Sequence, residues 1–209
     1  MTKQERLQKE IERTEQMREF EKPYAGKIVC GIDEVGRGPL CGPVVAAAVI
    51  LPKDCDILYI NDSKKLSEKK REEVNAALME KALAYGIGVV GPERIDEINI
   101  LQATFEAMRM AIDSLEIKPE ILLNDAVEIP LVDIEQVPII KGDAKSMSIA
   151  AASIIAKVHR DHLMMEYDKL YPEYAFASNK GYGTAAHIDA IKKYGLTPIH
   201  RRSFTKNFV

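Results

Sequence analysis

The chain has 209 residues and a net charge of −3, and 46% of its residues are hydrophobic while only 6% are aromatic. This length suits one domain with a core of mainly Ile, Val, Leu and Ala. The longest apolar run, Val44–Leu51, is too short to cross a bilayer, and the charged start, MTKQERLQKE, lacks the apolar segment of a signal peptide. Together these features argue against a membrane protein, and we expect no membrane partner.

Cysteine usage and charge distribution indicate the cellular compartment and the kind of partner. Cys30, Cys41 and Cys55 form an odd set without metal-site spacing, which predicts a reducing, cytoplasmic environment. The net charge argues weakly against a nucleic-acid partner. However, residues 141–209 hold 11 Lys and Arg against 6 Asp and Glu. A locally basic half can bind phosphates even in an acidic chain.

The first 26 residues are read apart from the rest. A charged helix is predicted over residues 3–22, and Pro23 and Gly26 end it. Its few apolar positions cannot hold a helix alone. We therefore expect residues 1–26 to be a helical extension or linker, with a substrate-binding role as the alternative, and residues 27–209 to form the main domain.

The chain is organised around residues 27–51, KIVCGIDEVGRGPLCGPVVAAAVIL. A strand is predicted over Lys27–Asp33, and it leads into the adjacent carboxylates of Asp33 and Glu34. Buried carboxylates require partners. The loop that follows is rich in Gly and Pro, which lets the backbone approach a ligand, and Arg37 offers a charged fork that fits phosphate. A solvated turn with incidental charges is the alternative reading of this loop.

The remaining elements alternate between strands and helices. The apolar patterns and the caps at Ser67, Asn99 and Thr184 predict strands over 43–51, 86–91, 121–125 and 137–140, a turn or short helix over 92–98, helices over 68–84, 99–115, 146–170 and 184–194, and an irregular basic tail over 195–209. Small residues near the start of the 146–170 helix predict close packing on a sheet. The order indicates a mixed α/β sheet with helices on both faces.

Carboxylates recur where predicted strands end. Asp33 ends the first strand with Glu34 beside it, Asp125 ends the fourth, and Asp143 follows the fifth. Such ends meet at one edge of a sheet, where ligands of α/β proteins bind. Clustered carboxylates repel one another unless cations lie between them, and oxygen-only ligands favour Mg²⁺ or Mn²⁺. For Asp143 alone, a helix-cap role is an equal alternative.

An acidic cluster of this kind suits two-metal phosphoryl chemistry, and no P-loop, HExxH or dinucleotide motif competes with it. The stretches DEVGRGPL, GPVVAAAVIL and KGDAKSMSIAAASIIAKVHRD closely resemble the signatures of ribonuclease HII, the bacterial type 2 ribonuclease H. The resemblance extends from about residue 27 to the C-terminus. It implies a ribonuclease H-like fold, a five-stranded mixed sheet flanked by helices with a C-terminal helical segment.

The resemblance also implies roles for individual residues. The four carboxylates match the catalytic and metal-binding set of the family, for Mn²⁺ or Mg²⁺. Backbone groups of the GRG motif recognise the ribose 2′-hydroxyl, the tyrosine of GYGT stacks on the following sugar, and the NDSKKL motif contacts the substrate backbone. The matching residues here are Asp33, Glu34, Asp125 and Asp143, then Gly36, Arg37 and Gly38, then Tyr182, and finally Asn61, Ser63 and Lys64. The alternative for Tyr182 is a core tyrosine, and the alternative for Asn61, Ser63 and Lys64 is a solvated helix entry.

The implied activity is that of an endoribonuclease. It hydrolyses RNA in RNA–DNA hybrids and cuts 5′ to single ribonucleotides in duplex DNA, leaving a 3′-hydroxyl and a 5′-phosphate. The expected partners are these nucleic acids, and we expect a monomer. Two alternatives remain: another two-metal nuclease, such as a junction resolvase or an exonuclease, and a non-catalytic nucleic-acid-binding protein. The second leaves the four acids unexplained.

Several polar residues outside these motifs are ambiguous. Four basic residues either contact backbone phosphates or lie on solvated surfaces, namely Lys157, Arg160, Arg201 and Arg202. His187 and His200 lack metal-ligand spacing, so we expect them at the surface. Cys41 replaces the small residue expected in many relatives after GPL, and we attach no functional consequence to it.

Overall fold

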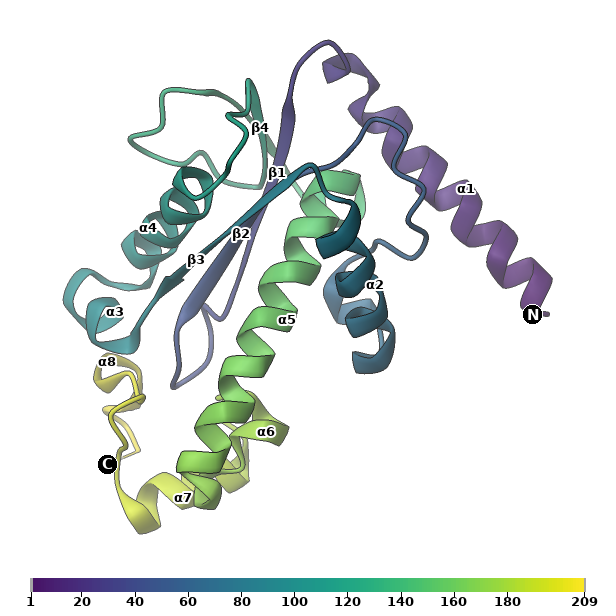
Figure 1. Cartoon of the computed structure of the whole chain (residues 1–209). Coiled ribbons are helices and arrows are strands. Elements are labelled where there is room, and N and C mark those ends of the chain that lie inside the picture. The colour runs from purple at the N-terminus through teal and green to yellow at the C-terminus, as the bar shows by residue number, and fades with distance from the viewer. Residues whose placement is uncertain (1, 209) are drawn as a thin grey trace.

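Five strands form a single mixed sheet in the order β3-β2-β1-β4-β5 in the computed structural model, which describes residues 2–208 (Figure 1). The strands β1–β2 and β2–β3 pair antiparallel, whereas β1–β4 and β4–β5 pair parallel. Their bounds are β1 Val29–Val35, β2 Val44–Ile50, β3 Ala84–Val90, β4 Ile121–Asp125 and β5 Glu135–Ile139. This confirms the predicted five-stranded mixed sheet.

Helices account for most of the remaining chain. They are α1 Lys3–Glu21, α2 Glu68–Lys81, α3 Pro92–Ile98, α4 Ile100–Asp113, α5 Met147–Leu170, α6 Phe176–Asn179, α7 Ala185–Tyr194 and α8 Arg202–Thr205. Short 3₁₀ turns cover Lys22–Tyr24, Ser63–Lys65, Gly142–Ala144 and Pro172–Tyr174. Within residues 2–208, no helix combines the length and apolarity that a bilayer crossing needs.

Strand β2, which lies between β3 and β1, is buried on both faces because helices cover both sides of the sheet (Figure 1). Side chains alternate along a strand. Val45, Ala47 and Val49 therefore pack in the cluster that contains α5 and α2, whereas Val44 and Ala46 pack in the cluster that contains α4. The expected small-residue packing of α5 is confirmed, since its alanines at 150–152 are completely buried.

Close approach on the α4 side depends on two glycines of β3. A Cβ built on Gly86 meets the carbonyl oxygen of Ala111 at 2.0 Å, and one on Gly88 meets that of Ala107 at 1.9 Å. No side chain fits in that space, so only glycine lets α4 lie directly on β3. Leu101, near the start of α4, lies outside this packing and is exposed.

The element boundaries differ modestly from those predicted. Strand β4 has the predicted bounds, and Ser67, Asn99 and Thr184 cap helices as predicted. Helix α2 ends at Lys81 because the chain must already pair as β3 from Ala84. The predicted turn or short helix at 92–98 is the helix α3, and the tail that was expected to be irregular contains the short helix α8.

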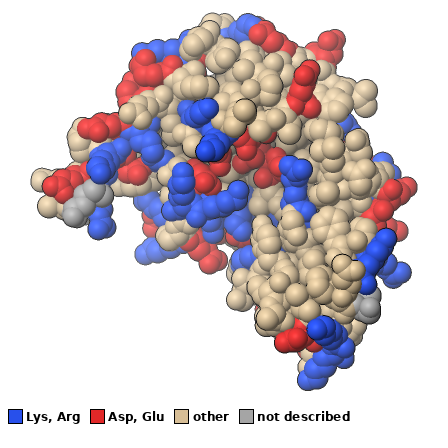
Figure 2. Space-filling model, turned by 180° about the vertical axis from the view of Figure 1, so that it is seen from behind, with Lys and Arg blue, Asp and Glu red and all other residues tan. Residues whose placement is uncertain are grey.

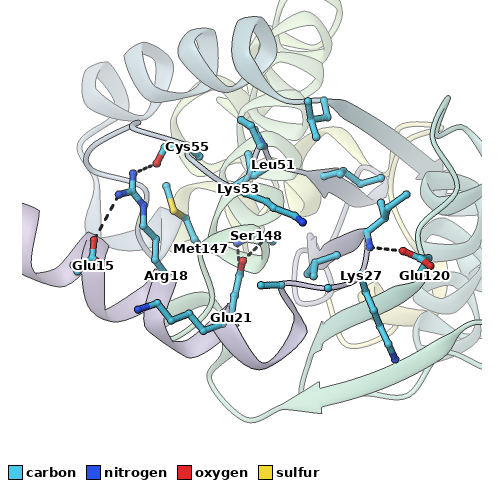
Figure 3. Close-up of a pocket in the computed structure, with 18 residues that line it drawn as sticks. Glu15, Arg18, Glu21, Lys27, Leu51, Lys53, Cys55, Glu120, Met147 and Ser148 are labelled. Carbon is cyan, nitrogen blue, oxygen red and sulfur yellow. Dashed lines mark hydrogen bonds and ion pairs between the residues drawn. The ribbon is translucent and has the colours of Figure 1, made fainter.

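Helix α1 is fastened to the body at its C-terminal end. Met17 is buried, and the Glu21 carboxylate accepts a hydrogen bond from the Ser146 hydroxyl at 2.5 Å. It also accepts one from the Ser148 amide at 2.8 Å (Figure 3). Ser146 is the N-cap of α5, so Glu21 supplies negative charge at the start of that helix. The end of α1 is thus tied to the segment that follows Asp143.

Candidate active site

Parallel pairing brings two of the predicted carboxylates together. Ile32 of β1 lies opposite Asn124 of β4, so the next residues along, Asp33 and Asp125, occupy equivalent positions on neighbouring strands. Asp125 ends β4, but the prediction that Asp33 ends its strand is wrong, because β1 continues to Val35 as it pairs with β2. All four predicted carboxylates line one cavity of about 300 Å³. The lining residues are Asp33, Glu34, Val35, Ser63, Lys64, Asp125, Asp143, Ser153, Lys157 and Tyr182.

Local hydrogen bonds hold the acidic side chains in place. The Asp33 carboxylate accepts from the Glu34 amide at 2.8 Å, and Asp125 Oδ1 accepts from the Gly142 amide at 2.7 Å. The second bond fixes the 3₁₀ turn that carries Asp143 beside the end of β4. Glu34 forms an ion pair with Arg37 at 3.3 Å. The segment after β5 is therefore anchored to β4 through a carboxylate of the site itself.

The site is electrostatically strained without a cation. Burial raises the pKa of Asp33 well above its usual range, and the charges of Glu34 and Asp125 add to this. Burial also raises the pKa of Glu34, with Arg37 opposing. For Asp143, burial and then the charges of Asp62 and Asp125 raise the pKa. Three carboxyl groups are thus harder to ionise than in water, which a positive charge among them would reverse.

The donor set fits hard divalent cations. Besides the four acids and Val35, the cavity is lined by the hydroxyl groups of Ser63, Ser153 and Tyr182 and by two lysines, Lys64 and Lys157. Carboxylate and hydroxyl oxygens suit Mg²⁺ or Mn²⁺ better than zinc. Within residues 2–208, no three of these carboxylates have oxygens that all lie within 4.8 Å of one another.

The substrate-binding residues predicted from sequence lie around this cavity to different extents. Ser63, Lys64 and Tyr182 line it, and Tyr182 is 44% exposed, so it is not a core tyrosine. Asn61 does not line it, and its side chain accepts instead from the Asp62 amide at 2.8 Å. Residues 36–38 do not line the cavity but adjoin it through Tyr182, because a Cβ built on Gly38 would come within 3.8 Å of the Tyr182 ring. This loop therefore lies at the rim of the cavity.

Two cavity residues were not predicted as part of the acidic site. Ser153 hydrogen-bonds the Ser63 hydroxyl at 3.0 Å, and its hydroxyl lowers the pKa of Asp33 against the larger opposing effect of burial. Lys157 pairs with Asp161 at 2.7 Å, and it was expected only as a possible phosphate contact. Both lie on α5, four residues apart and therefore on one face of the helix, and this spacing is the signal that would have found them.

The prediction that His187 and His200 lie at the surface is wrong. Both are buried beside Cys41, and their Nε2 atoms are 3.1 Å apart. Since the Thr197 amide donates to Nδ1 of His200, that ring carries its proton on Nε2. His187 donates from Nδ1 to the Tyr182 carbonyl, so its Nε2 accepts. With Cys41, this group has metal-ligand spacing, but its partners satisfy all four nitrogens in the neutral form.

Neither reading proposed for Arg160 and Arg201 is correct. Both side chains are completely buried, so they contact neither phosphate nor solvent. Their guanidinium groups donate to backbone carbonyls of the 36–43 loop and of Lys180. Arg202, the next residue, is exposed. Sequence patterns could not separate these arginines from surface ones because all their partners except Lys180 lie more than a hundred residues away.

A larger cavity, of about 460 Å³, lies between α1 and the sheet (Figure 3). Its charged side chains carry both signs, and several already have partners: Arg18 pairs with Glu15, and Glu120 accepts a hydrogen bond from the Ile28 amide. An apolar floor that includes Leu51 and Met147 lies beneath them. Without converging carboxylates, this cavity offers no comparable chemistry, so the smaller, acidic cavity is the candidate active site.

Comparison with known proteins agrees with this site. The sequence model of the family "Ribonuclease HII" matches residues 30–207. The chain belongs to the ribonuclease HII family. It is 65% identical to the ribonuclease HII of Lachnoclostridium phytofermentans over 97% of this chain and 80% of that protein, and 56% identical to that of Clostridioides difficile over 99% and 82%.

Solved structures show the same fold. The ribonuclease H2 of Pyrococcus horikoshii matches with a TM-score of 0.72 at 29% identity, over 86% of this chain and 96% of that one. The ribonuclease HII of Archaeoglobus fulgidus, solved in complex with PCNA, matches with a TM-score of 0.73 at 25% identity, over 86% and 94%. As a member of the ribonuclease HII family, this protein is an endoribonuclease of the ribonuclease H class that acts on RNA–DNA hybrids.

Proposed function

We propose that this ribonuclease HII also cuts duplex DNA 5′ to a single embedded ribonucleotide, leaving a 3′-hydroxyl and a 5′-phosphate. One observation carries the proposal: the four carboxylates face a cavity that also includes the exposed Tyr182, with the 36–38 loop at its rim. A catalytic centre and a sugar-sized recognition surface thus adjoin each other. Only the 2′-hydroxyl distinguishes RNA from DNA at one nucleotide.

We assign the metal-binding and catalytic roles to Asp33, Glu34, Asp125 and Asp143. Bound divalent cations, Mn²⁺ or Mg²⁺, supply an activated water and charge neutralisation at the phosphate in a two-metal site. A related ribonuclease HIII was solved with Mn²⁺. The raised pKa values of Asp33, Glu34 and Asp143 support this assignment, because burial, to which neighbouring carboxylates add, disfavours the ionised forms that a bound cation would stabilise.

The substrate is positioned by groups around the acids. In this proposal, Tyr182 stacks on the sugar after the ribonucleotide, and backbone groups of Gly36–Gly38 contact its 2′-hydroxyl. Asn61, Ser63 and Lys64 contact the substrate backbone, although Asn61 lies outside the cavity. On the face shown in Figure 2, Lys and Arg side chains gather near its middle, where they can attract nucleic acid.

We further propose a catalytic domain over residues 27–209, to which residues 1–26 are attached as an extension held by Glu21. The protein acts as a monomer in the cytoplasm. Support comes from the Glu21 contacts with Ser146 and Ser148, and from the three cysteines, which are all free and buried. Size-exclusion chromatography with light scattering tests the monomer.

The central experiment uses a labelled DNA duplex that holds one ribonucleotide. With Mg²⁺ or Mn²⁺, we expect a single cut on the 5′ side of the ribonucleotide, and none when a chelator is added. An all-DNA duplex of the same sequence is the control. Cutting of that control points to another two-metal nuclease, such as a resolvase. Cleavage only on the 3′ side, or an uncut ribonucleotide strand, contradicts the proposal.

A further inference from the structure

Two buried arginines donate hydrogen bonds to the carbonyl oxygens of the 36–43 loop, which includes the segment proposed above to recognise the ribonucleotide. Arg160 on α5 and Arg201 before α8 are both 0% exposed, and neither forms an ion pair with any residue in the 2–208 range. Burying an unpaired charge is costly unless hydrogen bonds compensate for it. Burial lowers the pKa of Arg201 to about 9, with the neighbouring charge of Arg160 adding to the effect. Such a cost suggests a specific purpose.

Arg201 binds almost the whole loop through its carbonyl oxygens. Its Nη2 donates to Gly36 at 2.6 Å, its Nη1 to Arg37 at 3.1 Å and to Pro39 at 2.9 Å, and its Nε to Gly42 at 3.0 Å. A planar guanidinium with five donors can satisfy four carbonyls at once, which a lysine ammonium cannot do in this fan-shaped arrangement.

Arg160 supports the same loop and joins it to the tyrosine segment. Its Nε donates to the Pro43 carbonyl at 2.9 Å, its Nη2 to Cys41 at 3.1 Å and its Nη1 to Lys180 at 2.8 Å. Lys180 lies two residues before Tyr182. One side chain thus fixes the distance between the Gly-rich loop and the tyrosine of the site.

The direction of these carbonyls determines where the loop amides point. In a planar trans peptide, the C=O of one residue and the N–H of the next point in opposite directions, and the described chain has no cis peptide bond. With the Gly36 and Arg37 carbonyls turned inward to Arg201, the Arg37 and Gly38 amides face outward. Among residues 2–208, neither amide donates to another protein group.

The loop needs glycine at its first position for the same reason. Gly36 has a φ of +93°, and a Cβ there would meet Arg160 Nε at 2.4 Å and the Pro43 carbonyl oxygen at 2.7 Å. The backbone therefore lies directly on the Arg160 side chain. Only a residue without a side chain permits both the positive φ and this contact.

We propose that Arg201 and Arg160 are positioning residues for ribonucleotide selection: by holding the loop carbonyls inward, they aim the Arg37 and Gly38 amides at the 2′-hydroxyl oxygen. This inference rests on the proposed function and extends it to residues outside the substrate cavity. Arg201 sets the direction of the amides, and Arg160 sets their distance from Tyr182. Neither side chain touches the substrate.

The test measures selection separately from general duplex binding. In the full chain carrying Asp125→Asn to prevent cutting, dissociation constants are measured for two duplexes that differ only in one ribonucleotide. We expect Arg201→Lys to reduce the preference for the ribonucleotide duplex by about tenfold, the effect of a well-placed hydrogen bond. Affinity for the all-DNA duplex should change by less than about twofold, because the phosphate contacts that provide it remain.

Arg202→Lys is the matched control, since it makes the same chemical change at the adjacent, exposed residue. This variant should leave the preference unchanged. If Arg202 contacts a phosphate, the substitution would weaken binding of both duplexes to the same extent. A folded Arg201→Lys chain with an unchanged preference overturns the inference. If the parent chain itself shows no preference, the proposed ribonucleotide recognition fails instead.

A second approach does not depend on folding of the Arg201 variant. Arg160→Lys should likewise reduce the preference, and a folded variant with full preference contradicts the role given to Arg160. In the Asp125→Asn chain, the Arg37 and Gly38 amide resonances should shift on binding the ribonucleotide duplex and much less with all-DNA duplex. Equal shifts with both duplexes overturn the outward-facing amide arrangement.

Discussion

The acidic cavity and the buried basic network that adjoins it differ in how their charges are satisfied. At the strand ends, Asp33, Glu34 and Asp143 have raised pKa values because each is buried near other negative charges. Arg160 and Arg201, which lie against the 36–43 loop, are more deeply buried. Their guanidinium groups, however, donate hydrogen bonds to seven backbone carbonyl oxygens. In the first region, the Glu34–Arg37 ion pair offsets only part of the effect of burial and repulsion. In the second, hydrogen bonds within the protein satisfy both guanidinium groups.

This contrast indicates that the acidic cavity, and not the buried basic network, is the region that binds a charged ligand. A cluster of like charges is stabilised by a ligand of opposite charge. Because cation binding relieves the repulsion among the carboxylates in the free protein, that repulsion favours binding of cations. A network satisfied by the backbone instead rigidifies the chain around it. The two regions meet at the 36–38 loop, where the Glu34–Arg37 ion pair comes from the acidic side and the Arg201 hydrogen bonds come from the basic side.

The largest effect is expected at Asp125, whose charge raises the pKa of the other acids in the cavity. Asp125→Asn should abolish cleavage while raising the melting temperature in chelator by about 2–4 °C, because repulsion is relieved and an amide oxygen still accepts from Gly142. Gel assays and thermal unfolding measure the two effects. Cleavage at the normal rate would refute the role given to Asp125, and a lowered melting temperature would contradict the repulsion.

Next in size is a pH effect within the basic region. Burial, and then His187, lower the pKa of His200 from 6.5 to about 4. Between these pH values the unfolded chain binds a proton that the folded chain does not, so the free energy of unfolding falls as the pH drops from 6.5 to about 4. The maximum loss is about 3 kcal/mol, and above pH 6.5 this group has no effect.

Chemical denaturation across this pH range measures the loss, with His200→Asn as the comparison. The asparagine does not titrate, and its side-chain oxygen can still accept from the Thr197 amide. Stability of the variant should therefore depend less steeply on pH below 6.5. The cavity carboxylates titrate in both proteins, so the difference between the two slopes isolates the histidine. Equal slopes would contradict the lowered pKa.

The smallest effect concerns the contact that fastens α1 to the start of α5. Glu21→Ala removes the acceptor of the Ser146 and Ser148 hydrogen bonds, which should cost about 1 kcal/mol, as for other helix caps. In a chain of this size, the melting temperature should fall by about 2–4 °C. Glu19→Ala is the matched control: Glu19 pairs only with the exposed Lys22, so no change is expected. Equal melting temperatures for both variants would contradict a fastening role.

The sequence predicted those features that depend on local patterns. Strand β4 ends at Asp125 as its apolar run predicts, and Ser67 and Thr184 cap helices because their side chains accept from amides three residues on. The meeting of the four carboxylates followed from strand order, which places the ends of β1 and β4 side by side. Periodicity and topology thus sufficed for the acidic region.

The basic network could not be predicted in this way. Arg160 lies on a helix whose small residues indicate packing, but nothing in its neighbourhood reveals that its partner is the Pro43 carbonyl, 117 residues earlier. His187 and His200 come together only because α7 and the segment after it fold back on Cys41. Backbone carbonyls leave no signature in a sequence, so side chains that bind them look like surface residues.

The link between Gly36 and Arg201 spans 165 residues of the chain. During synthesis, Gly36 of the 36–38 loop is translated 165 residues before Arg201, whose guanidinium orders that loop. The acidic strands can pair before that point, while the selective loop cannot reach its final form. A prematurely terminated chain that lacks Arg201 would therefore carry the carboxylates without the means to choose where they cut.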